Sequence, residues 1–175
     1  MELLILVQAP LIVALFATLH RFAPPSGRSL TLAGLGMAVA MAMAALTMGV
    51  HVTVLTVGRL PAAHIPGFDR LLTWHCPSVP YAIDILAWDY FFGLALLLAM
   101  AAFPAGRVQR RIRIGMAASA ALCLAGGLLG VLSGNMQIRD IGIIGYGVVF
   151  PFTVVHMARL FTRSPTSAGE PAHSP

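Results

Sequence analysis

The chain has 175 residues, of which 58% are hydrophobic and only 10% are charged, and its mean hydropathy is +0.86. A soluble domain carries about 25% charged residues, so this composition excludes an ordinary soluble protein and indicates an integral membrane protein. The net charge of +5 comes from arginines in short segments between apolar stretches, without interleaved aromatic residues, which excludes nucleic acid as a partner.

Five apolar stretches are long enough to cross a hydrocarbon core, which requires about 20 residues. They cover residues 3–19, 32–57, 81–103, 114–132 and 141–161. The first has no basic residue before it and no small-residue cleavage site after it, so we expect a retained span and not a signal peptide. The sequence therefore predicts an all-α polytopic protein, a single transmembrane domain over 1–163 built as a bundle of five helices. The Pro- and Ser-rich residues 164–175 are expected to form a disordered tail.

The arginines predict the orientation in a cell membrane, inner or plasma, because positively charged loops stay in the cytoplasm. All basic residues are arginines, and eight of them fall on one side of the five predicted spans while three fall on the other. The first group is Arg21, Arg28, Arg107, Arg110, Arg111, Arg113, Arg159 and Arg163; the second is Arg59, Arg70 and Arg139. We therefore expect the N-terminus outside and the C-terminus in the cytoplasm.

The fourth span carries Gly126, Gly130 and Gly134, each four residues apart. Small residues at this spacing let membrane helices approach closely. We expect them to pack against another span of the same chain; the alternative is a contact face for a homo-oligomer. In the fifth span, Pro151 lacks a backbone donor and predicts a kink.

The third span holds two carboxylates, Asp84 and Asp89. A charge near the bilayer centre costs about 2.5–3.5 kcal/mol, so intramembrane carboxylates point to a functional site. At about 1.5 Å per residue, Asp89 lies about 12 Å beyond Tyr81 and is too deep to reach the interface. On an ideal α-helix the two side chains point about 140° apart, so we do not expect them to act as a pair.

The candidate site combines these carboxylates with polar and aromatic groups on the same side of the bundle. His51 in the second span lies at a similar depth to Asp89 and is its expected proton-relay partner. Arg139 could form an ion pair with Asp84 or with its neighbour Asp140. The catalytic candidates are thus Asp89, Asp84 and His51, and the candidate substrate-binding residues are Trp88, Tyr90, Asn135, Gln137, Arg139 and Tyr146.

We expect neither a metal nor another cofactor. In the long connection 58–80, the spacing of His64, Asp69, His75 and Cys76 matches no zinc pattern. This connection is better explained as an interfacial lid in which Phe68, Leu71, Leu72 and Trp74 lie on the membrane surface. A haem held by two histidines is disfavoured because His51 and His156 lie at different depths.

Several functions fit these features. The first is a small membrane protein that binds a lipophilic, isoprenoid-like molecule in an outward-facing polar pocket and converts it by acid–base chemistry, such as isomerisation or cyclisation. The second is a non-catalytic subunit or accessory protein of a larger membrane complex. A transporter ranks last because the five spans show no internal repeat. The partners expected from the sequence are therefore membrane lipid, a lipophilic small molecule, and either a second copy of the chain or a larger complex.

Overall fold

The computed structural model describes residues 2–57 and 78–163. Every regular element within these ranges is helical, and five helices are long and apolar enough to cross a membrane. They cover Leu4–Phe22, Pro25–Val50, Val79–Ala102, Arg107–Ser133 and Met136–Thr162. The predicted all-α bundle of five membrane-spanning helices is confirmed.

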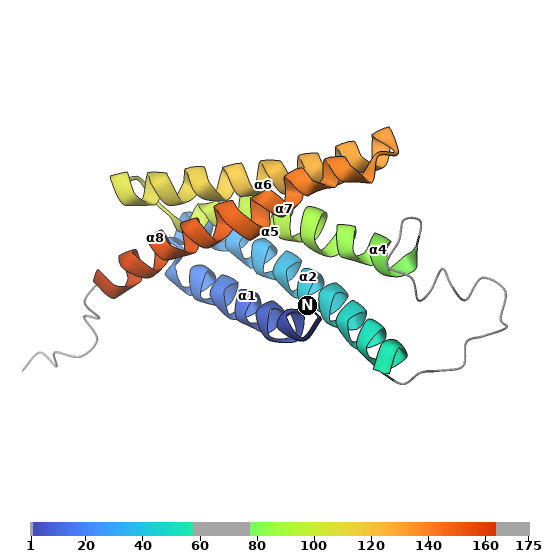
Figure 1. The fold of residues 1–175 in the computed structure, drawn as a ribbon. Helices are drawn as coiled ribbons and strands as arrows, with labels where there is room; N and C mark the ends of the chain where they lie inside the picture. Colours follow the sequence, from blue (N-terminus) through green and yellow to red (C-terminus); the bar gives the residue numbers. More distant parts are fainter. Residues whose placement is uncertain (1, 58–77, 164–175) are drawn as a thin grey trace, which may run out of the picture.

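The first two spans form a helical hairpin. Helix α1 (Glu2–Phe22) and helix α2 (Arg28–Val57) are joined through the short 3-10 turn η1 (Pro25–Gly27). The hairpin is closed by polar bonds: the Thr31 hydroxyl lies 3.0 Å from Nδ1 of His20 and donates to the carbonyl of Gly27. In Figure 1 this hairpin forms one side of the bundle.

The third span is built from four consecutive helical segments and lies between α2 and the later helices. It begins with α4 (Val79–Asp84), continues through the π-helical segment η2 (Ile85–Phe91) into α5 (Phe92–Ala99), and ends in the 3-10 turn η3 (Met100–Ala102). Helix α5 contacts both α2 and α6, so this span is central in the bundle (Figure 1).

The last two spans run beside each other along most of the bundle and separate toward the start of the fourth span (Figure 1). Helix α6 (Arg107–Ser133) ends at Gly134, whose φ of 66° is the left-handed conformation that glycine adopts without strain. The chain returns through η4 (Met136–Arg139), α7 (Asp140–Ile144), the π-helical segment η5 (Gly145–Val149) and α8 (Phe150–Arg163).

The helices are longer than the apolar stretches that predicted them. The fourth span was expected over 114–132 and the fifth over 141–161, but α6 begins at Arg107 and the return begins at Met136. Hydropathy reports only the part of a helix that matches the hydrocarbon core, whereas the backbone hydrogen bonding continues into the polar boundary. Those extra turns carry Arg107, Arg110, Arg111, Arg113, Arg139 and Asp140.

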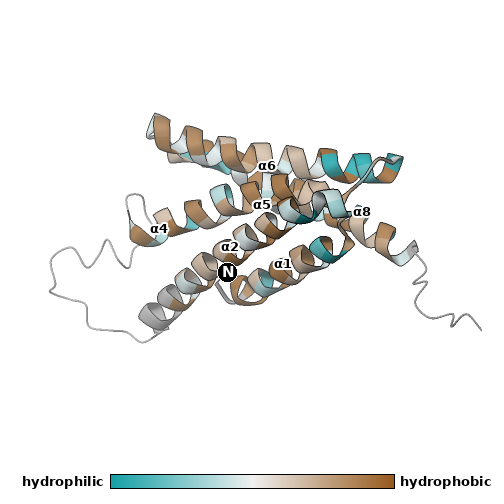
Figure 2. Cartoon of the chain, turned by 180° about the vertical axis from the view of Figure 1, so that it is seen from behind, coloured by the Kyte–Doolittle hydropathy of each residue, from teal (hydrophilic) through white to brown (hydrophobic). Residues whose placement is uncertain are grey.

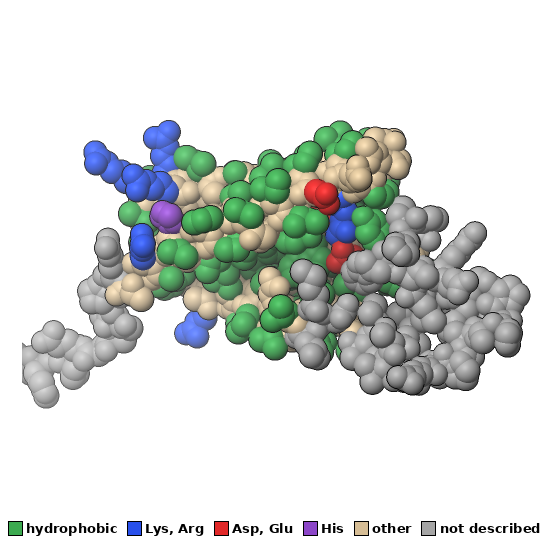
Figure 3. Space-filling view, in the orientation of Figure 1, with side chains coloured by type: hydrophobic (Ala, Val, Ile, Leu, Met, Phe, Trp, Pro, Cys, Tyr) green, Lys and Arg blue, Asp and Glu red, His purple; other side chains and the backbone are tan. Residues whose placement is uncertain are grey.

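Charge is distributed unequally between the two ends of the bundle. One end, here called the arginine-rich end, holds Arg21, Arg28, Arg107, Arg110, Arg111, Arg113 and Arg159 (Figure 3). The hydropathy colouring shows the same boundary at the start of α6, where hydrophilic residues give way to apolar ones (Figure 2). The described acidic side chains, Asp84, Asp89 and Asp140, lie toward the opposite end (Figure 3).

Four predictions fall partly or wholly outside the described residues, and one of them is the disordered tail expected over 164–175. The proposed interfacial lid and the alternative metal ligands lie in 58–77, which the structure does not describe. His51 lies in α2, but its side chain is also outside the described part.

Candidate functional site

The candidate site is positioned by the first turn of the third span. Ser78 caps this helix, because its hydroxyl accepts a hydrogen bond from the backbone N–H of Tyr81 at 3.2 Å. Pro80 stands in the first turn, where its missing N–H costs nothing. The helix therefore begins two residues earlier than predicted, and the Tyr81 ring comes to lie beside the polar residues described next.

The π-helical segment η2 brings Asp84 and Asp89 onto the same side of the third span. Within it the backbone N–H of Phe92 donates to the carbonyl of Ala87, five residues earlier. Since a π-turn joins residues five apart instead of four, the residues at i and i+5 come into line. The expectation that the two carboxylates point about 140° apart was wrong, because it assumed an uninterrupted α-helix.

Arg139 joins both carboxylates. Its Nε donates to Oδ2 of Asp89 at 2.7 Å, and its Nη2 donates to Oδ2 of Asp84. The three side chains form the acid–arginine cluster, and all three are buried, with Asp89 0% exposed, Arg139 5% and Asp84 8%. The planar fork of a guanidinium can bond two carboxylates in fixed geometry, which a lysine ammonium cannot do.

Arg139 is thus a partner of Asp89 that the sequence did not predict, whereas the expected pairing of Asp89 with His51 falls on a side chain outside the described part. The alternative pairing of Arg139 with Asp140 is not found, since Asp140 is exposed and the guanidinium faces the third span. The ion pair with Asp84 was correctly anticipated. The pairing of Arg139 with Asp89 could be predicted from the sequence only if a π-turn was assumed between Asp84 and Asp89.

Glycines on two helices make room for the cluster. A Cβ on Gly127 of α6 would lie 2.6 Å from Cβ of Asp89, and a Cβ on Gly142 of α7 would overlap with Oδ1 of Asp89. A Cβ on Gly126 would lie 2.5 Å from the backbone nitrogen of Gly142. The glycine pattern of α6 is thus used within the chain, as predicted, although Gly127 was not among the residues singled out.

One polar atom of the cluster has no hydrogen-bond partner among the described residues. Oδ1 of Asp89 is fully buried and faces Gly142, while Oδ2 of the same carboxylate bonds Arg139. A buried oxygen without a partner is uncommon and costly. With both carboxylates ionised, the cluster also carries one negative charge in excess. The cluster thus has both an unbalanced charge and an oxygen without a hydrogen bond.

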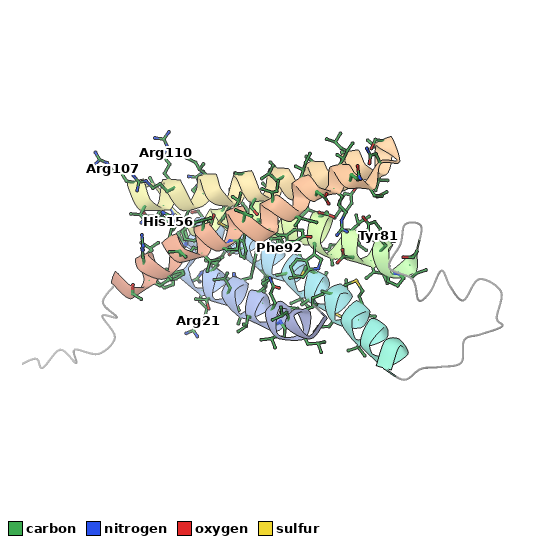
Figure 4. The ribbon with its side chains drawn as sticks, in the orientation of Figure 1. Arg21, Tyr81, Phe92, Arg107, Arg110 and His156 are labelled. Atoms are coloured by element: carbon green, nitrogen blue, oxygen red, sulfur yellow. The ribbon has the colours of Figure 1, made fainter. Side chains whose placement is uncertain are left out.

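Aromatic side chains enclose the cluster from two directions. The Tyr81 ring lies 5.0 Å from Cζ of Arg139, a cation–π distance. Trp88 packs on Tyr146 with 5.3 Å between ring centroids and edge-on against Phe92 at 6.0 Å. In Figure 4 Tyr81 is at the opposite end of the bundle from Arg107, Arg110 and His156, with Phe92 between them. Phe92, with Trp88 packed against it, thus lies between Tyr81 and the arginine-rich end.

The remaining candidate residues are distributed differently. Trp88 is buried, and Tyr90 and Tyr146 are half-buried, with Tyr90 beside Gly127. Asn135 and Gln137 are exposed: the Asn135 side chain accepts from the backbone N–H of Gln137 at 3.1 Å and so caps η4. These two residues hold the turn that presents Arg139 and do not line the cluster.

The sequence matches no protein-family model, and neither a search of curated proteins nor one of solved structures finds a match.

Proposed function

We propose that the acid–arginine cluster is an acid–base site for a lipophilic small molecule. The reaction class that suits it is isomerisation or cyclisation of an isoprenoid-like compound. In an isomerisation, a proton added to one carbon of a double bond leaves a cation on the other carbon. Loss of a proton from the next carbon along then forms the shifted double bond, so no oxidant or further co-reactant is required. Carboxyl groups that hold and release one proton can perform both steps.

The observation that carries this proposal is the composition of the cluster, two buried carboxylates on a single guanidinium. One proton shared by the carboxylates would neutralise the excess negative charge. Asp84 would exchange that proton with the ligand, because it is the less buried of the two. Asp89, fully enclosed, would be a positioning residue that acts through Arg139.

The aromatic groups suit an apolar ligand. Tyr81 and Tyr146 are half-buried beside the cluster, and Trp88 packs against Tyr146. Their rings offer flat apolar contact, and the faces of Trp and Tyr attract cationic charge that develops when a double bond is protonated.

Substitution of one carboxylate by its neutral isostere tests the proposal. We expect Asp84→Asn, and likewise Asp89→Asn, to keep or raise the thermal midpoint in detergent, because each leaves one carboxylate on Arg139 and replaces the protonated carboxyl group with a neutral amide. The double variant should unfold at lower temperature, because Arg139 is then buried without a counter-charge. Infrared spectra of the wild type at neutral pH should contain a protonated-carboxyl band that at least one single variant lacks.

Binding and conversion of a lipophilic compound are measured on the wild type and the same variants. Lipophilic compounds that co-purify with the wild type are identified by mass spectrometry, and the extract is incubated with each variant. Asp84→Asn should still bind the compound but no longer convert it.

If both single variants lower the midpoint as much as the double variant does, the carboxylates are both ionised and the cluster is a structural network. That outcome would favour the alternative, a non-catalytic subunit of a larger membrane complex, for which the close glycine packing around Asp89 is the supporting observation.

We further infer that the arginine-rich end faces the cytoplasm of a cell membrane, with the N-terminus outside and the C-terminus inside, because arginine-rich ends are retained there. The acid–arginine cluster would then lie in the outer half of the membrane. A phosphatase reporter fused after Pro175, active only outside the cytoplasm, should be silent, and a cytoplasmic fluorescent reporter at the same position should be bright. The reverse pattern would invert the orientation.

A further inference from the structure

The arginine-rich end contains a cleft between α6 and α8 that the acid–arginine cluster does not use. The cleft has a volume of about 170 Å³ and is lined by Val108, Arg111, His156, Arg159 and Leu160. It contains cationic groups from two helices and aliphatic side chains in the same small space. From this arrangement we infer a binding site for the phosphate group of an anionic phospholipid.

The cleft exists because α6 and α8 are in close contact at one level and separate beyond it. At Gly115 the helices are so close that a Cβ would overlap with the Thr153 side chain. Toward the arginine-rich end the two helices separate (Figure 1). Arg111 stands one turn from Gly115, and Arg159 stands nearly two turns from Thr153, so both arginines lie where the space has opened.

The charge at the cleft is not balanced by acidic side chains in the described part of the chain. Asp84 and Asp89 are committed to Arg139, and Asp140 follows it directly at the far end. Arg111 and Arg159 are both exposed, and further exposed arginines at 107, 110 and 113 surround them. An anion entering the cleft therefore meets an uncompensated positive field, and two guanidinium forks can bond the oxygens of one phosphate.

His156 adds a polar atom to the same wall. Its Nδ1 lies 2.9 Å from the carbonyl oxygen of Phe152, so this nitrogen donates to the backbone and fixes the ring. With Nδ1 as the donor, Nε2 of a neutral ring is an acceptor, which suits a hydroxyl of a lipid headgroup and not a phosphate oxygen. Arg159 is three residues further along α8, on the same side of the helix.

The surroundings of the cleft favour a lipid over a soluble phosphate. Val108 and Leu160 line it, and the exposed side chains on the adjoining turns of α8 are Phe152 and Val155. A headgroup phosphate held between Arg111 and Arg159 would leave its acyl chains beside this apolar surface. Basic pockets between membrane helices at the bilayer boundary suit anionic headgroups for the same reason.

The test compares two double variants that lose equal charge. Arg111→Gln with Arg159→Gln removes the cleft arginines, whereas Arg21→Gln with Arg28→Gln removes two exposed arginines from the same end but outside the cleft. Each protein is placed in nanodiscs of phosphatidylcholine containing a minor fraction of phosphatidylglycerol, and bound lipid is measured by native mass spectrometry. The full chain is used throughout, and circular dichroism verifies the helical content.

We expect the wild type and the control pair to retain phosphatidylglycerol in preference to phosphatidylcholine. The cleft pair should bind phosphatidylglycerol at least about tenfold more weakly, equivalent to about 1.4 kcal/mol. Equal losses in both double variants would mean that the attraction is diffuse and would overturn the site, as would unchanged binding in the cleft pair.

Two further measurements on the wild type separate the sources of phosphate and do not depend on the variants folding. Inorganic phosphate at millimolar concentration should leave phosphatidylglycerol bound, since the lipid gains apolar contacts as well. If inorganic phosphate displaces the lipid, the cleft is a site for a soluble anion and the lipid assignment is wrong. If the wild type shows no preference for phosphatidylglycerol over phosphatidylcholine, the proposal fails without reference to any substitution.

Discussion

At the scale of single residues, the acid–arginine cluster is exceptional because a charged group is expensive inside a membrane unless it is paired. Arg139 satisfies one oxygen of Asp84 and one of Asp89, so a single cation stabilises two carboxyl groups. Removal of one partner from a buried ion pair generally costs more than the pair itself contributes. The consequence is an asymmetry: loss of the arginine should be far more damaging than loss of either aspartate.

We therefore expect Arg139→Leu to lower the free energy of unfolding by about 3 kcal/mol, the lower end of the cost of an unpaired buried charge, because the remaining carboxyls can take up protons. Arg139→Lys should fall between this variant and the wild type, since an ammonium cannot bond both carboxylates in a fixed fork. Thermal unfolding in detergent micelles measures both. Arg113→Leu, on the exposed side of α6, serves as the control and should change stability by no more than about 0.5 kcal/mol. Equal effects at Arg139 and Arg113 would show that the cluster does not hold the bundle together.

At the scale of helices, two π-turns distinguish this bundle from five plain α-helices. The first, η2, aligns Asp84 with Asp89, and the second, η5, lies just before Pro151 in the last span. In η5 the N–H of Phe150 donates to the carbonyl of Gly145, and the Ser119 hydroxyl of α6 donates to the same carbonyl at 2.8 Å. The sequence predicted a kink at Pro151, and the structure has a π-turn that ends at Val149, supported by a side chain of the neighbouring helix.

The close approach of α6 to the third span gives a second test of how the cluster is supported. Gly127→Ala would place a methyl group 2.6 Å from Cβ of Asp89 and should lower the free energy of unfolding by about 1–3 kcal/mol, as overpacking does. Gly36→Ala is the matched control, because a Cβ on Gly36 in α2 meets nothing within 4 Å. This control should be neutral or stabilise by up to about 1 kcal/mol through helix propensity. Chemical unfolding in mixed micelles compares the two variants, and a Gly127→Ala protein as stable as Gly36→Ala would mean that Asp89 can shift freely.

At the scale of the whole molecule, the number and type of the spans could be predicted from hydropathy, because a helix that crosses lipid must be long and mainly apolar. The site required more, because it depends on local departures from ideal helices. Arg139 appeared to lie outside the span when depth was calculated at a constant rise per residue, so its bond to Asp89 was not predicted. A π-turn in one helix and glycines in two others bring Arg139 and Asp89 together, and none of these effects alters the hydropathy pattern.

Some candidate residues have a structural role that the sequence did not predict. Asn135 and Gln137 were chosen as polar groups near the membrane surface, but an asparagine before a helical turn can cap the backbone, as it does here. Tyr81 was used only to mark where a helix begins, whereas its ring lies against the guanidinium of Arg139. Polarity alone does not distinguish a ligand-facing side chain from one that stabilises a turn.

The sequence separation within the cluster has a consequence for biosynthesis. Arg139 lies 50 residues after Asp89 and 55 after Asp84, so a ribosome completes the third span well before it reaches their common partner. During that interval the two aspartates lack their counter-charge and can enter the bilayer only as neutral, protonated carboxyl groups. We therefore expect the third span to reach its final stability only after the residues around Arg139 have been synthesised.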